Sequence, residues 1–427
     1  MELTICINNQ AAGRLLYDDT SETFAVEYSN SWENTGFPLS PHIPFRQRTE
    51  GRAVANFIAN LLPEGHALDH LSSAIAVSKH NLFGLFKAIG EEPTGAFRFM
   101  PQGCAEAEDR FLQIDESELS RRIRNRHQDG LILWDGKPRL SVAGVQQKLP
   151  IMINSAGEFG FGDGRLASTH ILKFAEPETN IVLNEYLSMQ LARQIGLPVP
   201  DTKITDLGSE PVLLVERFDR ERAADGSIKR RHIIDGCQML NLPPALKYEW
   251  PHGHGRDVAH LRTGASLKKL FDLTEQCEVP AMAKKAMIQW TLFNLIIRNA
   301  DAHAKNISFF ITPRVIQPAP FYDLINIGLH KNYAQELALG IGDEYDYERL
   351  SPQDFYDFCE ECKIPPRLLL GEMKNMTKNL PEKLDDITTD LPEICKNEKT
   401  FITAYTQSVL QNCGYILGLI ERSVDVS

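Results

Sequence analysis

The sequence lacks the features that mark secreted and membrane proteins. Its first residues, MELTICINNQ, hold neither the basic nor the apolar segment of a signal peptide, and no run approaches the roughly 18 apolar residues of a membrane span. Its 8 cysteines are far apart, which excludes the dense framework of a small disulfide-stabilised protein, and we expect them to be reduced. The sequence therefore predicts a cytoplasmic protein with no membrane partner.

An excess of positive charge is also lacking. With 45 Lys and Arg against 57 Asp and Glu, the net charge of −12 opposes non-specific attraction to nucleic acid, so any DNA contact is expected to come through a partner. Internal repeats and low-complexity tracts are absent, and a hydrophobic content of 43% is that of a globular protein rather than a disordered one. The 427 residues allow about two or three domains.

The pattern of apolar residues indicates a strand-rich front half and a helical back half. Runs such as LTICIN, LPIMI and PVLLVERF are typical of strands, whereas NEYLSMQLARQIGLPVP repeats an apolar residue every four positions and stops at Gly196, as an amphipathic helix does. From about residue 265 the pattern is mostly helical, apart from the strand-like NISFFIT and RVIQPA. We expect three parts, residues 1–110, 111–245 and 246–427.

The most informative segment follows AMIQWTLFNLII, a stretch so apolar that it predicts a buried helix. Directly after it come NADAHAKN, a strand pair and Phe321-Tyr322-Asp323. Asn306 lies 5 positions after Asp301, and Asp323 lies 17 positions further on, which is the order of residues in the catalytic loop and metal site of protein kinases. Polar side chains at the end of a buried helix are expected to be held in place.

Phosphoryl transfer requires these residue types. One carboxylate must accept the proton of the acceptor hydroxyl, while an amide oxygen and a second carboxylate hold Mg²⁺ on the phosphates. Asp301 fits the first role, and Asn306 and Asp323 fit the second. The alternative is that Asp301 and Asn306 cap a helix or turn and that Asp323 begins a loop.

Two upstream segments hold lysines that a phosphate would attract. Residues 141–148, SVAGVQQK, form a small-residue loop whose backbone N–H groups can approach phosphate oxygens, with Lys148 at its end. Lys173 lies within the apolar HILKFA, where a buried ammonium group requires an anion, either a phosphate of ATP or Glu185 on the next helix. The alternative for residues 141–148 is an ordinary loop that connects two strands. The alternative for Lys173 is a side chain that extends from an edge strand into water.

Further candidates carry more than one interpretation. Residues 212–219, VLLVERFD, change from apolar to polar along the chain. This pattern fits a hinge that binds adenine, and it equally fits the end of a buried strand. For Cys359 and Cys362 we expect reduced thiols on a helix rather than a zinc site. For His252, His254 and His260 we expect a glycine-rich surface loop rather than a metal site. For the basic cluster we expect a solvated helix face rather than a site for phosphate or an acidic partner; its members are Arg121, Arg122, Arg124 and Arg126.

Several of these segments together resemble one family. In chain order they are SVAGVQQK, HILKF, NEYLSMQLARQIGLPVPD, LLVERFDR, CQMLNLPPALKYE, NADAHAKN and PFYDL. The chain is similar, over nearly its whole length, to the HipA-type serine/threonine kinase toxins of bacterial toxin–antitoxin modules. The resemblance implies an α+β, bilobed, protein-kinase-like (HipA-like) fold with a strand-rich N-lobe, an extra N-terminal subdomain and a helical C-lobe, and ATP with Mg²⁺ between the lobes.

The resemblance also implies roles at single positions. Asp301 would be the catalytic base, Asn306 and Asp323 the Mg²⁺ ligands, and Ser141 the site of an inactivating autophosphorylation. The nucleotide would be bound by a larger set, with Lys173 on the phosphates and Glu216 and Phe218 as the adenine hinge: Val142, Ala143, Gly144, Val145, Gln146, Lys148, Lys173, Glu216, Phe218, His303 and Lys305.

The function implied is a toxin that transfers the γ-phosphoryl group of ATP to a protein serine or threonine. The target would be a translation component such as an aminoacyl-tRNA synthetase, and growth would be inhibited. A small HipB-like helix-turn-helix antitoxin would be the partner and would supply the DNA contacts. Two alternatives stay open, a scaffold that completes an antitoxin–operator complex with dispensable catalysis and a kinase for a small molecule or lipid.

Overall fold

The structure is a computed structural model of the chain. It describes every residue except 102, 105–107, 127–130, 132, 140–146, 177–178, 209, 251–261, 390 and 425–427, and it leaves the side chains of residues 423–424 undescribed. Within this described part, no helix combines the length and the apolar character needed to cross a membrane.

The chain forms two compact units, and each is made from several segments. Unit 1 consists of Met1–Ala175, Thr205–Pro244 and Phe309–Val315. Unit 2 consists of Glu176–Ile204, Ala245–Ser308 and Ile316–Ser427. Three of the five boundaries fall within an element, namely strand β12 (Thr202–Asp206), the 3₁₀ turn η2 (Pro244–Leu246) and strand β17 (Ser308–Ile311).

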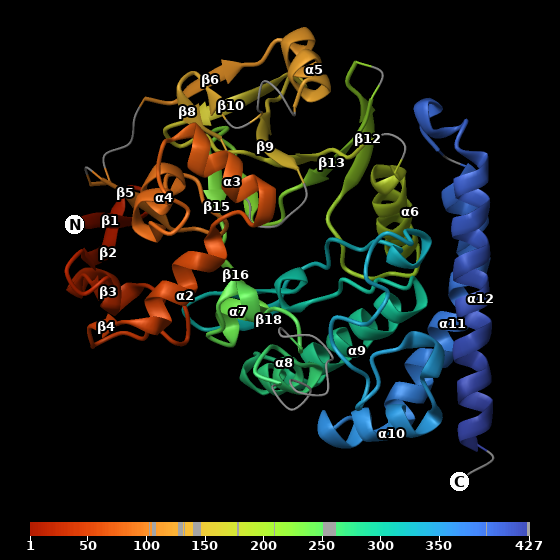
Figure 1. The fold of residues 1–427 in the computed structure, drawn as a ribbon. Coiled ribbons are helices and arrows are strands. Elements are labelled where there is room, and N and C mark those ends of the chain that lie inside the picture. Colours follow the sequence, from red (N-terminus) through yellow and green to blue (C-terminus); the bar gives the residue numbers. More distant parts are fainter. Residues whose placement is uncertain are drawn as a thin grey trace. The chain divides into compact units, whose positions relative to one another are not determined.

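The first part of unit 1 is an antiparallel sheet in the order β4-β3-β2-β1-β5, drawn in red to orange in Figure 1. The strand predicted at LTICIN is confirmed as β1, which forms a hairpin with β2, and Asn8 in the turn between them takes a left-handed φ of 50°. Its elements are β1 (Glu2–Ile7), β2 (Gln10–Asp18), β3 (Thr23–Tyr28), α1 (Asn30–Thr35), β4 (Thr49–Glu50), α2 (Arg52–Leu61), α3 (Gly65–Ala74), α4 (Leu82–Ile89) and β5 (Arg98–Met100).

The expectation that all cysteines are reduced is wrong for one pair. Cys6 and Cys104 form a disulfide, with their Cα atoms 5.5 Å apart and 98 residues between them in sequence. The pairing of β1 with β5 sets Cys6 opposite Arg98, and this brings the segment after β5 close to β1. Six cysteines remain free and buried: Cys237, Cys277, Cys359, Cys362, Cys395 and Cys413.

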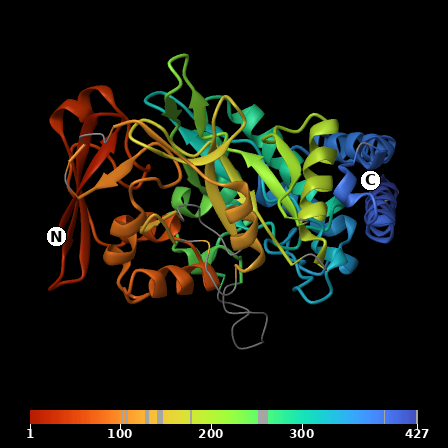
Figure 2. The same ribbon diagram turned by 90° about the horizontal axis from the view of Figure 1, so that it is seen from above.

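A second antiparallel sheet in unit 1 contains the order β13-β11-β9-β10-β6. One face of it packs on helix α5 through an apolar cluster that includes Leu119, Ile151 and Leu172. Figure 2 shows this part of the chain in orange, yellow and green. The remaining elements of the unit are β6 (Arg110–Gln113), α5 (Glu116–Arg124), β7 (Leu133–Trp134), β8 (Lys137–Pro138), β9 (Lys148–Ile153), β10 (Phe159–Asp163), β11 (His170–Lys173), β13 (Pro211–Glu216), β14 (Arg220–Arg222), β15 (Ile228–Arg230), β16 (Ile233–Asp235) and α7 (Gly236–Met239).

Unit 2 is mainly helical, as the sequence predicts. Its long helices α11 and α12 pack together and run side by side in Figure 1. The predicted helix before Gly196 is confirmed as α6, and the left-handed φ of 81° at Gly196 explains why the helix stops there. The elements are α6 (Ile181–Gln194), α8 (Leu267–Asp272), η3 (Leu273–Gln276), α9 (Pro280–Ile296), η4 (Ala304–Asn306), β18 (Ile316–Pro318), η5 (Ile327–Leu329), η6 (Tyr347–Arg349), α10 (Pro352–Glu361), α11 (Pro366–Thr389), η7 (Glu393–Cys395) and α12 (Lys399–Val424).

Candidate active site

Helix α9 places the polar loop that the sequence singles out. Its second half is buried around the whole circumference, from Met287 to Ile296, so its end is fixed inside unit 2. The chain leaves the helix at Arg298, which has a left-handed φ of 53°, and turns back on itself. The polar residues that follow are therefore held on a rigid support.

Asn299 connects this loop to the segment that carries Asp323. Its backbone N–H donates to the carbonyl of Asn294 at 2.8 Å, and its side-chain Nδ2 donates both to Asn294 Oδ1 at 2.8 Å and to the carbonyl of Asp323 at 3.1 Å. Asp323 has a left-handed φ of 54°, a conformation uncommon outside glycine, asparagine and aspartate. One buried amide thus connects the end of helix α9 to the backbone of Asp323.

Asp301 is accessible and oriented. Its side chain is 49% exposed, and its Oδ1 accepts a hydrogen bond of 2.7 Å from the Tyr248 hydroxyl. A donor on one carboxylate oxygen restrains the rotation of the group about Cβ–Cγ. An exposed carboxylate in a fixed orientation is what a base acting on the hydroxyl of another molecule requires.

His303 lies under this carboxylate as a neutral ring. Its side chain is 8% exposed, its Nε2 lies 4.0 Å from Asp301 Oδ1, and its ring meets the Tyr248 ring edge-on at 5.2 Å. Burial, followed by the positive charge of Lys247, lowers the pKa of His303 well below its ordinary value. The ring is therefore uncharged at neutral pH and packs against the tyrosine that holds Asp301.

The short turn η4 brings Asn306 back toward Asp301. Asn306 Nδ2 donates to the backbone carbonyl of Asp301 at 2.9 Å, so the amide oxygen Oδ1 is the atom left for a metal ion. Lys305 is 6% exposed, and its backbone carbonyl accepts a hydrogen bond of 2.7 Å from the Tyr322 hydroxyl. The five-residue spacing seen in the sequence thus closes a compact loop.

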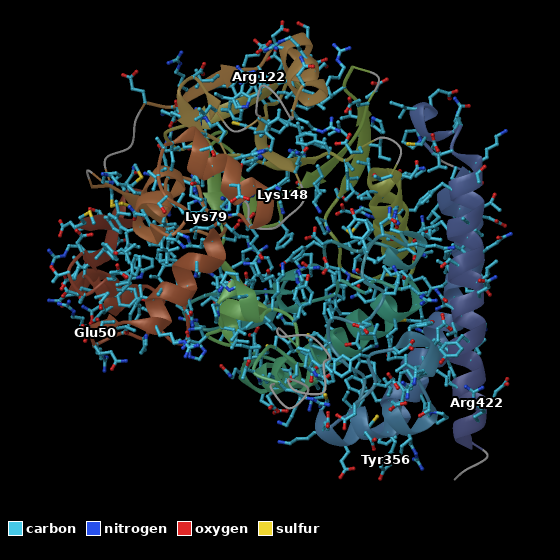
Figure 3. The ribbon with its side chains drawn as sticks, viewed as in Figure 1. Glu50, Lys79, Arg122, Lys148, Tyr356 and Arg422 are labelled. Carbon is cyan, nitrogen blue, oxygen red and sulfur yellow. A yellow bond between two sulfur atoms is a disulfide. The ribbon has the colours of Figure 1, made fainter. Side chains whose placement is uncertain are left out.

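In unit 1, two of the predicted phosphate-binding lysines are direct partners across the sheet. Lys148 on β9 lies opposite Lys173 on β11, so both side chains are on the same face. They are only 8% and 4% exposed, respectively. Figure 3 labels Lys148 at the start of its strand. Two ammonium groups on one face suit an anion such as a phosphate group.

Strand β13 ends at Glu216, where the sequence predicts either an adenine hinge or the end of a buried strand, and both interpretations stay predictions. Glu216 is exposed and lies opposite His170, and Phe218 meets Phe310 edge-on at 6.1 Å. Glu185, the suggested partner of Lys173, lies on α6 in unit 2 and is 2% exposed. That pairing stays a prediction. Six predicted positions lie outside the described residues: Ser141, Val142, Ala143, Gly144, Val145 and Gln146.

The weaker candidates do not form metal sites among the described residues. Cys359 and Cys362 are buried free thiols, and burial raises the pKa of Cys359 to about 11, which disfavours the thiolate that zinc requires. His252, His254 and His260 lie outside the described residues.

The expectation of a solvated arginine face on α5 is wrong in part. Arg121 and Arg122 pair with Glu118 at the surface, and Arg122, labelled in Figure 3, lies over the Trp134 ring at 4.0 Å. Arg126 instead is buried and bonds Glu210 at 2.8 Å. Sequence reasoning missed this because Glu210 is 84 residues away.

Sequence reasoning also missed the residues that support the catalytic loop. Tyr248 was visible only as part of ALKYE and carried no role, although it holds Asp301 from a distance of 53 residues in sequence. Asn299 was part of the loop motif but gave no sign of its bond to Asp323.

Comparison with known proteins places this geometry in a family. A model described as "HipA-like C-terminal domain" matches residues 140–384, and one described as "HipA N-terminal domain" matches residues 3–100. The serine/threonine-protein kinase toxin HipA of Shewanella oneidensis is 39% identical over 100% of this chain and 98% of its own length. The chain belongs to the HipA family.

A further relative and a solved structure agree with this assignment. The putative kinase Y4mE of Sinorhizobium fredii is 29% identical over 86% of this chain and 87% of its own length. A solved structure of the Shewanella oneidensis HipA, HipB and operator DNA complex matches with a TM-score of 0.92 and 38% identity, covering 100% of both chains. The HipA-like kinase fold expected from the sequence is confirmed, and the chain is a kinase of the HipA toxin family.

Proposed function

We propose that this HipA-family chain transfers the γ-phosphoryl group of ATP to a serine or threonine hydroxyl of a protein, with Asp301 as the base. The observation that supports this most directly is the carboxylate of Asp301, half-exposed and oriented by the Tyr248 hydroxyl at 2.7 Å. A protein substrate presents its hydroxyl from outside, so the base must reach the surface. The name of the Shewanella oneidensis relative, a serine/threonine-protein kinase toxin, supports a protein acceptor.

This loop and the segment that carries Asp323 supply the groups that a Mg²⁺ ion prefers. Oxygen ligands from one amide and one carboxylate, Asn306 Oδ1 and Asp323, suit a hard divalent cation that keeps several waters and binds the phosphates. Bound Mg²⁺ would neutralise charge that develops on the transferred group. The protein's own part is to hold both ligands through Asn299 and the Asn306 bond to Asp301.

We propose that unit 1 supplies the nucleotide-binding groups. The Lys148 and Lys173 ammonium groups on one sheet face suit the ATP phosphates, and the exit of β13 at Glu216 and Phe218 offers backbone groups to adenine. Lys305 and His303 would contribute from the catalytic loop. The loop before Lys148, residues 142–146, would cover the phosphates.

The experiment that tests catalysis replaces the proposed base and compares it with a control that removes the same charge elsewhere in unit 2. Asp301→Asn is expected to keep the fold and the ATP affinity but to slow transfer by about 10²–10⁴-fold, and growth inhibition on expression should disappear. Asp343→Asn is the matched control, because Asp343 is also exposed in unit 2 and pairs with Arg262. A growth defect that persists in Asp301→Asn would favour the scaffold alternative, and a labelled small molecule or lipid would favour a different acceptor.

Regulation and partners form a second set of proposals. We propose that the chain inactivates itself by phosphorylating Ser141, because about −1.5 to −2 charges there would repel the nucleotide phosphates. Mass spectrometry after incubation with ATP and Mg²⁺ should find one phosphate at Ser141 in the wild type and none in Asp301→Asn.

A HipB-like antitoxin would be the partner and would make the main DNA contacts. The Shewanella oneidensis relative is seen with HipB and operator DNA, and the net charge of −12 here disfavours direct binding to DNA by this chain alone. We further propose a cytoplasmic location, a translation component such as an aminoacyl-tRNA synthetase as target, and the three-part division at residues 110 and 245. Quantitative phosphoproteomics of cells that express the wild type or Asp301→Asn would identify the target.

A further inference from the structure

A buried network of charged side chains lies directly after strand β13 in unit 1. The two proposed hinge residues are not part of it, because Glu216 is exposed and Phe218 is only partly buried. Arg217, Asp219 and Arg220 are instead buried, with exposed fractions of 4%, 4% and 8%. Buried charges require partners, so the contacts of these three residues determine how the end of the strand is held.

Asp219 is the centre of this network. Its Oδ1 accepts from Arg217 Nε at 2.9 Å, and its Oδ2 accepts from Arg217 Nη2 at 2.8 Å, from Arg220 Nη1 at 2.6 Å and from the Gly95 backbone N–H at 3.0 Å. Burial would raise the pKa of Asp219, but the charges of Arg217 and Arg220 outweigh it and hold the pKa below its ordinary value. An ionised carboxylate thus connects the residues after β13 to Gly95.

Arg220 makes further bonds to the segment around Gly95, which lies between α4 and β5. Its Nη1 donates to the Gly95 carbonyl and its Nη2 to the Pro93 carbonyl, both at 3.0 Å. Gly95 has a left-handed φ of 85°, and a Cβ atom there would come within 2.9 Å of His232 Nδ1. This close approach of the two segments therefore requires a glycine.

Ser168 extends the network to Glu92. Arg217 Nη1 donates to the Ser168 hydroxyl at 2.9 Å, and this hydroxyl donates to Glu92 Oε1 at 2.6 Å. The Ser168 backbone N–H donates to the same oxygen at 2.5 Å. The carbonyl of the next residue, Thr169, accepts from the backbone N–H of Arg217 at 2.8 Å. Side chains and backbone together hold the segment that follows Glu216.

The network joins two parts of the chain that separate family models describe. Residues 92–95 belong to the N-terminal match, whereas residues 168 and 217–220 belong to the C-terminal match. All of them lie in unit 1. Hydrogen bonds between buried charges depend strongly on geometry, so such a network favours one arrangement of the backbone that carries it.

We propose that Asp219 is a positioning residue for the binding of ATP. It holds the exit of β13 against residues 92–95, so that the backbone groups of Glu216 and Phe218 meet adenine in one fixed geometry. The N-terminal part of the chain thereby supports nucleotide affinity from behind the site. This inference rests on the proposed role of the β13 exit as the adenine hinge.

The test is calorimetry of the full-length chain with Mg²⁺ and two probes, ADP and IDP. They share ribose and phosphates, but the purine of IDP carries an oxygen where that of ADP carries the amino group. The wild type should bind ADP about tenfold more tightly, because a site that hydrogen-bonds a group rejects an analogue that lacks it. A variant that disturbs only the hinge should lose affinity for ADP and keep its affinity for IDP.

Two variants disturb the network to different degrees. Asp219→Asn should abolish the preference for ADP, but it leaves two buried arginines without their carboxylate and can prevent folding. Ser168→Ala is milder, because it removes only the hydroxyl between Arg217 and Glu92. It should weaken ADP binding by about threefold, the scale of one hydrogen bond, and should leave IDP binding unchanged. In transfer assays the loss should appear in the KM for ATP and not in kcat.

Ser120→Ala is the matched control for Ser168→Ala. Ser120 is also a buried serine of unit 1, 8% exposed, and lies on α5 beside Gly208, which precedes the opposite end of β13. The control should bind ADP and IDP as the wild type does. An equal loss of ADP binding in Ser120→Ala would overturn the inference, because a buried hydroxyl far from the hinge would then have the same effect.

Other results separate this inference from the hinge itself. An equal loss of ADP and IDP affinity in Ser168→Ala would indicate a merely structural role, and an unchanged preference for ADP would show that the network does not position the hinge. Either result overturns the inference while the wild type still prefers ADP. A wild type that binds ADP and IDP equally would instead refute the proposed hinge, and the inference with it.

Discussion

Removal of one hydroxyl group, in Tyr248→Phe, tests whether the orientation of Asp301 matters for catalysis. The variant loses the 2.7 Å hydrogen bond to Asp301 Oδ1 but keeps the aromatic ring that packs edge-on against His303. A hydrogen bond to a charged group contributes roughly 1.5–3 kcal/mol when it is buried. Asp301 is 49% exposed, so water replaces part of the bond and about 1 kcal/mol is the appropriate scale.

This free energy corresponds to roughly a fivefold fall in kcat. The KM for ATP should stay the same, because the base acts on the acceptor hydroxyl and not on the nucleotide. The measurement is the initial rate of label transfer from ATP to protein, at several ATP concentrations. A loss in KM alone would indicate that Tyr248 supports the nucleotide instead.

Tyr347→Phe is the matched control for Tyr248→Phe. It removes the same atom in the same unit, but the Tyr347 hydroxyl is buried with no hydrogen-bond partner among the described residues. Its kcat should match the wild type, and its stability should be equal or slightly higher. An unchanged kcat in Tyr248→Phe, or an equal fall in both variants, would refute the positioning role.

Three further predictions concern metal, pH and redox state. Asp323→Ala should abolish the Mg²⁺-dependent tightening of ATP binding in calorimetry, and an enhancement equal to that of the wild type would remove Asp323 from the metal site. Burial lowers the pKa of His232 to about 4, whereas the same group in the unfolded chain has a pKa of roughly 6.5. Between these two pH values the unfolded state binds more protons than the folded state does. The free energy of unfolding should therefore fall by up to about 3 kcal/mol as the pH is lowered from 6.5 to 4. Denaturant titrations at both pH values measure this fall, which should be smaller in His232→Asn. Reduction of the Cys6–Cys104 bond, which spans 98 residues, should lower the unfolding free energy by up to about 4–5 kcal/mol, and equal midpoints with and without reductant would contradict this.

Local patterns in the sequence determined much of the fold. The strands and helices that were predicted have strong apolar patterns or clear stop signals, such as the strand LTICIN and the helix that stops before Gly196. The sequence also indicated that Asp301 and Asn306 share one short loop, because they are five residues apart and interact through one tight turn. In such segments the residues that interact are also close in sequence. Their types and spacing are therefore enough to predict the local structure.

Contacts between distant segments were decided only by the tertiary structure. Tyr248 holds Asp301 across 53 residues, and Asp219 accepts from the Gly95 backbone across 124 residues. The opposition of Lys148 and Lys173 depends on strand register, where a shift of one residue would turn either side chain to the other face. The Cys6–Cys104 bond likewise joins residues that are 98 positions apart in sequence. Periodicity reports which face of an element is apolar, but which elements meet and in what register depends on the packing of the whole chain.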